Sequence, residues 1–375
     1  MSLFEARAEA LRTNRRTLAE TLHLDAPLLV CLLALSAISL FVLFSASGQN
    51  MDIIWRQALR LGVAFLIMLA LAQLNPATLM RWTPWLYGLG IALLLAVLFF
   101  GETGKGAQRW LDLGLFRFQP SEMMKLAVPM MVAWYLSDHP LPPSLKRLSV
   151  ASLLIIVPTL LIAKQPDLGT ALLIACAGVF VLLFSGISWR LIISSGALLA
   201  ACAPILWHFM HDYQRQRVLT FLNPEASPLG AGYHIIQSKI AIGSGGLYGK
   251  GWLNGTQSQL NFLPERSTDF IFAAYAEEFG LFGIIGLLSL YLLVIMRGLL
   301  ISAQAQDSYT RLLGGSLIMT FFIYIFVNIG MVSGLLPVVG VPLPLISYGG
   351  TSMVTLMAGF GILMSIHTHR KLLPR

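Results

Sequence analysis

The sequence predicts an all-α integral membrane protein of about ten transmembrane helices, with a long extracytoplasmic segment between spans 7 and 8. Hydrophobic residues make up 57% of the 375 residues, charged residues only 11%, and the mean hydropathy is +0.76. A soluble domain carries about 25% charged residues. Apolar runs of around 20 residues, enough to cross a hydrocarbon core of about 30 Å, recur along the whole chain. We therefore expect one membrane domain over residues 1–375.

The expected spans follow the apolar runs, in the order 27–47, 57–74, 83–100, 120–137, 148–164, 168–185, 190–209, 269–297, 311–335 and 345–367. The first run follows a basic arm, residues 1–26, and could be mistaken for a cleaved signal peptide. Both the arm and the run are too long for one, so we interpret the run as an uncleaved first span.

Lys and Arg near the spans predict the orientation. With the N-terminus inside, the short cytoplasmic segments hold thirteen Lys and Arg and the short outer loops hold six. The positive-inside rule then places residues 1–26 and the tail 368–375 on the cytoplasmic side of the membrane, and the 210–268 loop outside. The net charge of +8 is explained by these flanking residues and gives no indication of nucleic-acid binding.

Ionisable residues within or beside the spans are candidates for function, because charge at membrane depth is costly. Glu122 and Lys125 share one helix face at i,i+3, either as a structural ion pair or as substrate contacts. Asp167 follows a Gln-Pro turn before span 6 and is either a site residue or only a helix N-cap.

Asp269 lies where the long outer segment enters span 8. In the first turn of a helix the macrodipole favours an ionised carboxylate, which suits a general base, although an ordinary first-turn acid explains the position equally well. Glu277 lies about 80° around the same helix from Asp269 and Glu278 about 180°. If either shares a cavity with Asp269 it should be Glu277, whereas Glu278 is expected to pair with another helix or to face the cytoplasmic end.

The glycine-rich stretch 243–251 in the outer segment invites comparison with a phosphate loop but fails the Walker pattern. Its backbone amides, with Lys239 and Lys250, could still hold a pyrophosphate; a tight turn that requires glycine is the alternative. Arg109, Arg215 and Arg217 are further cations on the expected outer side that could bind phosphate bidentately.

Other polar features give weaker indications. His208, His211 and Asp212 have a spacing that could suit a metal, but an interfacial role is more typical, and no metal ligand set is predicted. The proline-rich run 337–344 cannot continue a helix, and Ser347 follows it as a further candidate site residue. Asn328 is a lone polar residue in an apolar span, typical of contacts between helices.

Five blocks together resemble the SEDS family (shape, elongation, division and sporulation), and more specifically its rod-shape branch. They are Gly106–Trp110, Gln119–Glu122, Gln165–Thr170, the 230–272 block, and the proline-rich run with Ser347–Gly350. The similarity spans nearly the whole chain. The choice of the rod-shape branch over the division branch rests on Tyr213–Arg217 and Gly255–Leu260.

The resemblance implies a peptidoglycan glycosyltransferase that polymerises lipid II during lateral cell-wall elongation. It implies Asp269 as the essential acid and functional roles for Glu122 and Lys125. It also implies a class B penicillin-binding protein as transpeptidase partner, together with other membrane proteins of the elongation machinery.

The expected mechanism follows from this substrate. Asp269 takes the proton of the acceptor 4-hydroxyl as general base, and the product forms with inversion. Lys125, Arg109, Arg215 and Arg217, with a possible Mg²⁺ or Mn²⁺ ion, offset the charge of the pyrophosphate leaving group; Lys239, Glu122 and Asp167 are further binding candidates. The competing hypotheses are a lipid II flippase or transporter, and a non-catalytic scaffold of the elongation machinery.

Overall fold

The structure is a computed structural model that describes residues 22–104, 107–112, 117–210, 212–224, 231–260, 262–263 and 265–369. Helices dominate these residues, so the prediction of a helical membrane protein is confirmed in its coarse form. Most of the basic arm and residues 370–375 of the tail lie outside the described residues.

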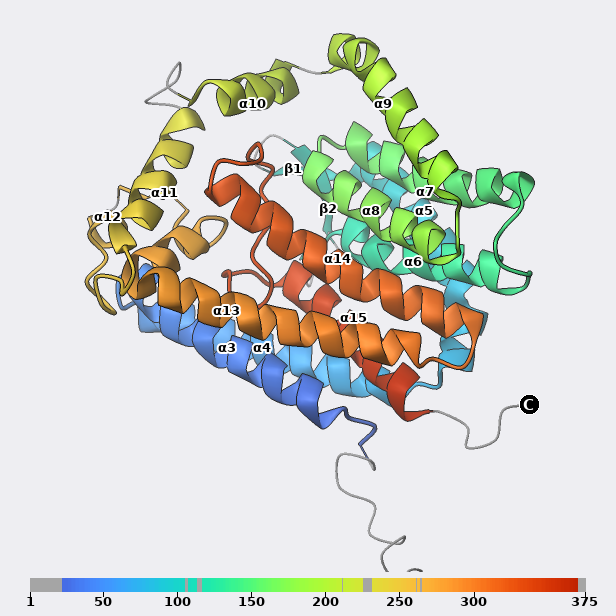
Figure 1. The fold of residues 1–375 in the computed structure, drawn as a ribbon, viewed down its shortest axis with the longest axis horizontal. Helices are drawn as coiled ribbons and strands as arrows, with labels where there is room; N and C mark the ends of the chain where they lie inside the picture. The colour runs from blue at the N-terminus through green and yellow to red at the C-terminus, as the bar shows by residue number, and fades with distance from the viewer. Residues whose placement is uncertain are drawn as a thin grey trace, which may run out of the picture.

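The helices follow the chain order shown in Figure 1. Their bounds are α3 (Ala26–Ala46), α4 (Met51–Ala72), α5 (Pro76–Phe100), α6 (Pro120–Ser137), α7 (Leu145–Lys164), α8 (Leu168–Phe184), α9 (Trp189–Phe209), α10 (Asp212–Leu222), α11 (Ala231–Gly245), α12 (Thr256–Gln259), α13 (Ile271–Ala303), α14 (Ser308–Val332) and α15 (Thr351–Thr368).

Each of the ten expected spans overlaps one of these helices. Among the described residues, seven helices are long and apolar enough to cross a membrane: α3, α4, α5, α7, α13, α14 and α15. Helix α8 and part of α9 are apolar but shorter. The chain is therefore a multi-pass membrane protein, and the count of ten spans stays a prediction.

A small antiparallel sheet is the one departure from an all-α fold among the described elements. Strands β1 (Glu102–Gly104), β2 (Ala107–Asp112) and β3 (Arg117–Phe118) lie in the order β1-β2-β3 between α5 and α6. The all-α prediction is corrected here. The sheet positions Arg109 just ahead of α6.

Helix α14 is the central helix of the bundle and packs against α6, α8, α13 and α15. Of its most apolar stretch 72% is buried inside the protein, compared with 22% for α4, α5, α7 and α13. Small residues let the helices approach closely. A Cβ on Gly298 would lie 2.6 Å from the Ile318 side chain, and one on Gly361 2.4 Å from the Met68 carbonyl oxygen.

The long outer segment carries helices of its own, α10, α11 and α12 (Figure 1). Helix α11 packs against α13 and against the end of α14. Helix α13 itself is kinked at Gly280, which has φ +63°, a conformation that glycine adopts without penalty. The backbone of the segment pairs with α13 around this kink, so the segment is fixed to the bundle there.

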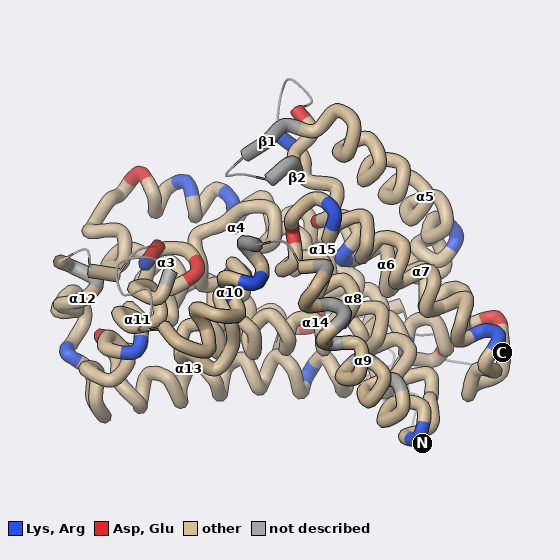
Figure 2. The backbone as a smooth tube through the Cα atoms, turned by 90° about the horizontal axis from the view of Figure 1, so that it is seen from above, with Lys and Arg blue, Asp and Glu red and all other residues tan. Residues whose placement is uncertain are grey.

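The two ends of the described chain meet at one end of the bundle. The rings of His23 and His369 stack with centroids 4.1 Å apart. Beside them Asp25, the N-cap of α3, forms an ion pair with Arg297 of α13 at 2.6 Å and lies 3.4 Å from His367 of α15. Elsewhere the tube in Figure 2 is mostly uncharged along the helices.

Candidate functional site

Asp269 lies in a turn that precedes α13. The N-cap of α13 is Phe270, and the first turn of the helix contains no acidic residue. The expectation of a first-turn acid is therefore wrong, because the chain reaches helical geometry two residues after Asp269. Asp269 is half-buried, and its position depends on the packing of this turn more than on the helix dipole.

Three successive carbonyl groups in this turn accept hydrogen bonds from the late part of the chain. The donors are the Tyr348 amide to the Ser267 carbonyl at 2.8 Å, the Ser347 hydroxyl to Thr268 at 2.7 Å, and Asn328 Nδ2 to Asp269 at 2.9 Å. These bonds fix the backbone that carries Asp269. Ser347, a candidate site residue from the sequence, therefore supports the turn: its hydroxyl holds a backbone carbonyl of the turn.

The proline-rich loop after α14 forms the wall beside Asp269. A Cβ on Gly340, which has φ +76°, would lie 3.6 Å from Asp269 Oδ2. A Cβ on Gly169, at the start of α8, would lie 2.9 Å from the Val339 carbonyl oxygen. The loop therefore brings the start of α8, which follows Asp167, into the same region as Asp269.

Asp167 is the N-cap of α8 and accepts a hydrogen bond from the Thr170 amide at 3.3 Å. The N-cap interpretation is confirmed, but Asp167 has more partners than a cap requires. Gln119 Nε2 donates to it at 3.2 Å and Arg109 Nε lies 3.7 Å away. Arg109 also donates to the Pro166 carbonyl. The structure thus joins two predicted site residues into one pair.

Glu122 and Lys125 form a buried ion pair on α6, with 2.7 Å between Lys125 Nζ and Glu122 Oε1. Thr355 of α15 donates to the other Glu122 oxygen at 3.1 Å. Lys125 Nζ lies 5.3 Å from the ring centroid of Tyr324 on α14. The pair therefore links α6 to α15 through Thr355, and its lysine also lines a cavity.

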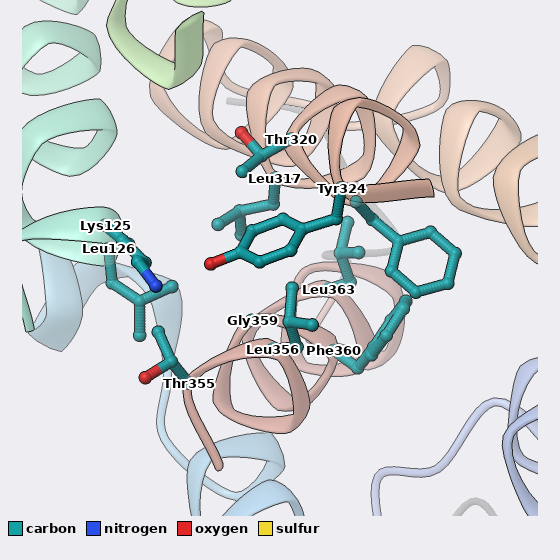
Figure 3. Close-up of a pocket in the computed structure, with 11 residues that line it drawn as sticks. Lys125, Leu126, Leu317, Thr320, Tyr324, Thr355, Leu356, Gly359, Phe360 and Leu363 are labelled. Carbon is teal, nitrogen blue, oxygen red and sulfur yellow. The ribbon is translucent and has the colours of Figure 1, made fainter. Parts of the chain in front are cut away.

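This cavity lies between α6, α14 and α15 (Figure 3). Its polar end is made of Lys125, Thr320, Tyr324 and Thr355, and apolar side chains such as Leu317 line the remainder. Tyr324 is 1% exposed, and its ring lies next to the Lys125 ammonium group at this polar end. Sequence analysis missed Tyr324, because an aromatic residue in an apolar span usually indicates only packing.

Glu277 is fully buried and lies against the 250–257 loop. Its carboxylate accepts hydrogen bonds from Lys250 at 2.7 Å, Thr256 at 3.0 Å and the Gln257 amide at 3.0 Å. Because the turn before α13 is not helical, the 80° angle calculated for a continuous helix does not apply. Glu278 accepts a hydrogen bond from Ser45 of α3, which agrees with the expected contact to another helix.

The glycine-rich stretch continues the end of α11 into a tight turn. Its contacts favour the interpretation as a turn that requires glycine over the interpretation as a pyrophosphate site. The amides of Lys250 and Gly251 donate at 3.0 Å to the carbonyls of Glu277 and Glu278. A Cβ on Gly249 would lie 2.1 Å from the Glu278 carbonyl oxygen, so glycine is required by close approach. Lys250 is paired with Glu277. The amides and the lysine are used in fixing the segment to α13.

The other cations of the long segment lie on α10 and α11. Arg215 donates to the carbonyls of Trp207 at 3.0 Å and His208 at 2.6 Å, which caps the end of α9. Arg217 is exposed on α10, which lies apart from α6 in Figure 1. Lys239 is exposed on α11, where a Cβ on Gly334 would lie 2.8 Å from its Nζ. The described contacts place none of the three beside Glu122 or Asp269.

One cation that the sequence argument used only for topology lies close to the site. Arg60 of α4 stacks over the Tyr348 ring, with its Cζ 4.5 Å from the centroid. Tyr348 is the residue whose amide holds the Ser267 carbonyl. Arg60 therefore lies one residue contact away from the turn of Asp269, a position that sequence spacing cannot reveal.

Two ionisable side chains with shifted pKa values, His234 and Arg266, lie near the same turn and outside the membrane-spanning helices. Burial lowers the pKa of His234 on α11, whose ring lies 5.6 Å from that of Phe270. Burial also lowers the pKa of Arg266. Within the described ranges no three His, Cys, Asp or Glu residues come together as a metal site. His211, from the proposed metal spacing, lies outside those ranges.

Comparison with known proteins gives a consistent family. The FtsW/RodA/SpoVE family, described as cell cycle protein, matches residues 24–372. The chain is 60% identical over 363 residues to the peptidoglycan glycosyltransferase MrdB of Escherichia coli K12, covering 96% of this chain and 98% of that protein. It is 32% identical to the peptidoglycan glycosyltransferase RodA of Treponema pallidum, covering 92% and 98%.

Two solved structures have the same fold. One chain, from work on the structural coordination of polymerization and crosslinking by a peptidoglycan synthase complex, is 33% identical with a TM-score of 0.81. It covers 93% of this chain and is itself covered to 98%. The rod shape determining protein RodA of Thermus thermophilus is 28% identical with a TM-score of 0.70, with coverages of 92% and 98%.

Proposed function

Because the chain belongs to the FtsW/RodA/SpoVE family and is a peptidoglycan glycosyltransferase, we propose that it polymerises lipid II with Asp269 as general base. The observation that carries the proposal is the position of Asp269. Asp269 is half-buried in a turn whose carbonyl groups accept three hydrogen bonds, and its carboxylate lies beside Gly340. The loop that contains Gly340 also contacts the start of α8.

The reaction requires one displacement. The acceptor 4-hydroxyl oxygen attacks the anomeric carbon of the donor, the bond from that carbon to the pyrophosphate oxygen breaks, and the hydroxyl proton passes to Asp269. General-base assistance of this kind contributes typically about 10²–10⁴-fold. A single in-line displacement converts the α-linked donor into a β-linked product with inversion.

The leaving pyrophosphate needs positive charge near it. Arg109 and Lys125 are the proposed cations, each already oriented by a carboxylate, Asp167 and Glu122 respectively. We add Arg60 to this set because it lies over Tyr348 beside the turn of Asp269. Arg215, Arg217 and Lys239 lie on the long outer segment, and we assign them to contacts with more distant parts of the substrate.

The location and partners are proposed on the same basis. The stacking of His23 on His369 supports a position of both chain ends on the same side of the membrane. We assign this side to the cytoplasmic face of the bacterial inner membrane. The likeness to a chain of a peptidoglycan synthase complex supports a class B penicillin-binding protein as partner. Together with other elongation proteins, this pair would build the lateral wall.

The test uses purified protein and labelled lipid II, with and without the penicillin-binding protein. Wild type forms glycan strands, and Asp269→Asn lowers the rate by about 10²–10⁴-fold, because the near-isosteric amide cannot take the proton. Asp52→Asn, at an exposed carboxylate on α4, is the matched control and retains activity.

Polymerisation at the wild-type rate by Asp269→Asn would remove Asp269 as the base. Movement of labelled lipid II across vesicles without polymer formation would favour the transporter alternative. A scaffold predicts intact glycan synthesis in cells that carry Asp269→Asn.

A further inference from the structure

Asn328 of α14 contacts the two segments that form the site of Asp269. Its Nδ2 donates one hydrogen bond to the Asp269 carbonyl at 2.9 Å and one to the Val341 carbonyl at 2.8 Å. We propose that Asn328 is a positioning residue for the reaction, which holds Asp269 against the proline-rich loop. This inference rests on the proposed role of Asp269 as base.

The orientation of the Asn328 amide is determined by its surroundings. An amide nitrogen carries two hydrogens, and both are used here on two carbonyl oxygens. If the amide were turned over, its own oxygen would face those two carbonyl oxygens without a hydrogen between them. Asn328 is 0% exposed, so no solvent would relieve that repulsion. The contact therefore works only as a donor clamp.

The partners of Asn328 are not those of a helix–helix contact. One is the turn before α13 and the other is the loop after α14, and neither is helical. Three hydrogen bonds hold this turn. Ser347 donates to Thr268 and the Tyr348 amide to Ser267, and of these three donors only Asn328 donates to Asp269 itself. The expectation from sequence, contact between helices, is corrected accordingly.

The second bond of Asn328 explains why the clamp matters for chemistry. Val341 follows Gly340, and a Cβ on Gly340 would lie 3.6 Å from Asp269 Oδ2. Asn328 thus fixes the residue that carries the carboxylate and the loop beside that carboxylate to one point. A displacement of about 1 Å at a reacting group can cost about 10²-fold in rate.

The same helix face also reaches the buried ion pair. Tyr324 lies four residues before Asn328, so the two side chains point from neighbouring turns of α14. Lys125 Nζ lies 5.3 Å from the Tyr324 ring centroid. Helix α14 therefore sets the spacing between the Lys125 cation and the Asp269 carboxylate. A residue in a loop could not fix the distance between these two charged groups by itself.

The test compares Asn328→Leu, which keeps similar volume without donors, with the wild type. We expect kcat to fall about 10–100-fold and KM to change less than about threefold, because the substrate contacts remain while the carboxylate is misplaced. In the Asp269→Asn background, Asn328→Leu should cause no further loss, because both changes act on the same proton transfer.

Ser316→Ala is the matched control on the same helix. Ser316 is 0% exposed and donates to the Ala177 carbonyl of α8 at 2.6 Å, away from Asp269. We expect this variant to lower the melting temperature and leave kcat within about twofold. A purely structural role for Asn328 would make Asn328→Leu behave like this control.

The outcomes separate the two proposals. Wild-type kcat in Asn328→Leu, together with an inactive Asp269→Asn, would overturn only the positioning role. Full activity in Asp269→Asn would overturn the proposed base. If Asn328→Leu does not fold, Asn328→Ala replaces it, and wild-type kcat or an additive loss with Asp269→Asn in that variant overturns the inference.

Discussion

Asp269 and Glu277 lie on either side of the start of α13, and the structure holds them in different ways. Asp269 is half-buried, and hydrogen bonds to the backbone carbonyls of its turn fix its position. Glu277 is 0% exposed, and its carboxylate itself accepts hydrogen bonds from Lys250, Thr256 and the Gln257 amide.

The difference separates a group placed for chemistry from a group used for structure. The Glu277 carboxylate joins the outer segment to α13, and protonating it would weaken those bonds. The three hydrogen bonds that hold the turn of Asp269 are accepted by backbone carbonyl groups, so a proton that arrives at its carboxylate leaves those three bonds in place. Burial depth alone would have ranked these two residues in the opposite order as functional candidates.

The largest stability effect is expected at Glu122–Lys125, a pair in which both charges are buried. Lys125→Met leaves Glu122 as an unpaired buried charge and should destabilise the protein by about 3–5 kcal/mol. The double variant Glu122→Gln with Lys125→Met should be more stable than Lys125→Met alone, because no uncompensated charge remains. Unfolding in detergent measures both.

Lys146→Met, at an exposed lysine on α7, is the control for the side-chain change and should have little effect. If the double variant is as unstable as the sum of the two single variants, the pair does not behave as one buried unit. Loss of polymerisation in a stable double variant would show that the pair also serves the substrate.

A smaller effect is expected at Glu277. Glu277→Gln removes the charge from three hydrogen bonds and should cost about 1.5–3 kcal/mol of unfolding free energy. Because the Glu277 carboxylate accepts hydrogen bonds from the 250–257 loop, we expect kcat to stay within about threefold of wild type. Asp138→Asn, at an exposed carboxylate after α6, is the matched control. A loss of activity as large as in Asp269→Asn would contradict a purely structural role for Glu277.

The smallest effect is expected at Asp25, at the end of the bundle where the described chain ends meet. Burial raises the pKa of Asp25, but hydrogen bonds from Arg297 and the Leu28 amide outweigh burial and bring the pKa below its usual 3.8. The stabilisation is present above about pH 4 and is lost as pH falls through the lowered pKa.

Asp25→Asn should therefore cost about 1 kcal/mol at pH 7, since Arg297 is partly exposed. The melting temperatures of variant and wild type should converge as pH falls below about 4. A difference that stays constant down to pH 3 would show that the ion pair contributes no pH-dependent stability.

Much of the candidate site was accessible from sequence, although its pairings were not. Charges near the spans singled out Glu122, Lys125, Asp167 and Asp269, and the i,i+3 spacing correctly paired the first two. The Arg109–Asp167 pair joins a strand to a helix 58 residues later, and no local periodicity links such positions. The angle between Asp269 and Glu277 could not be calculated from sequence, because a continuous helix was assumed where Asp269 lies in a turn.

By itself the sequence determined that this protein crosses the membrane many times, where charges would be costly, and which carboxylate would stand just ahead of α13. These follow from hydropathy and from charge placement along one chain, which are local properties. Only the tertiary structure decided what Asn328, Tyr324 and Arg60 do. Their roles depend on a turn, a loop and three helices meeting in space, and those contacts are set by packing between distant segments.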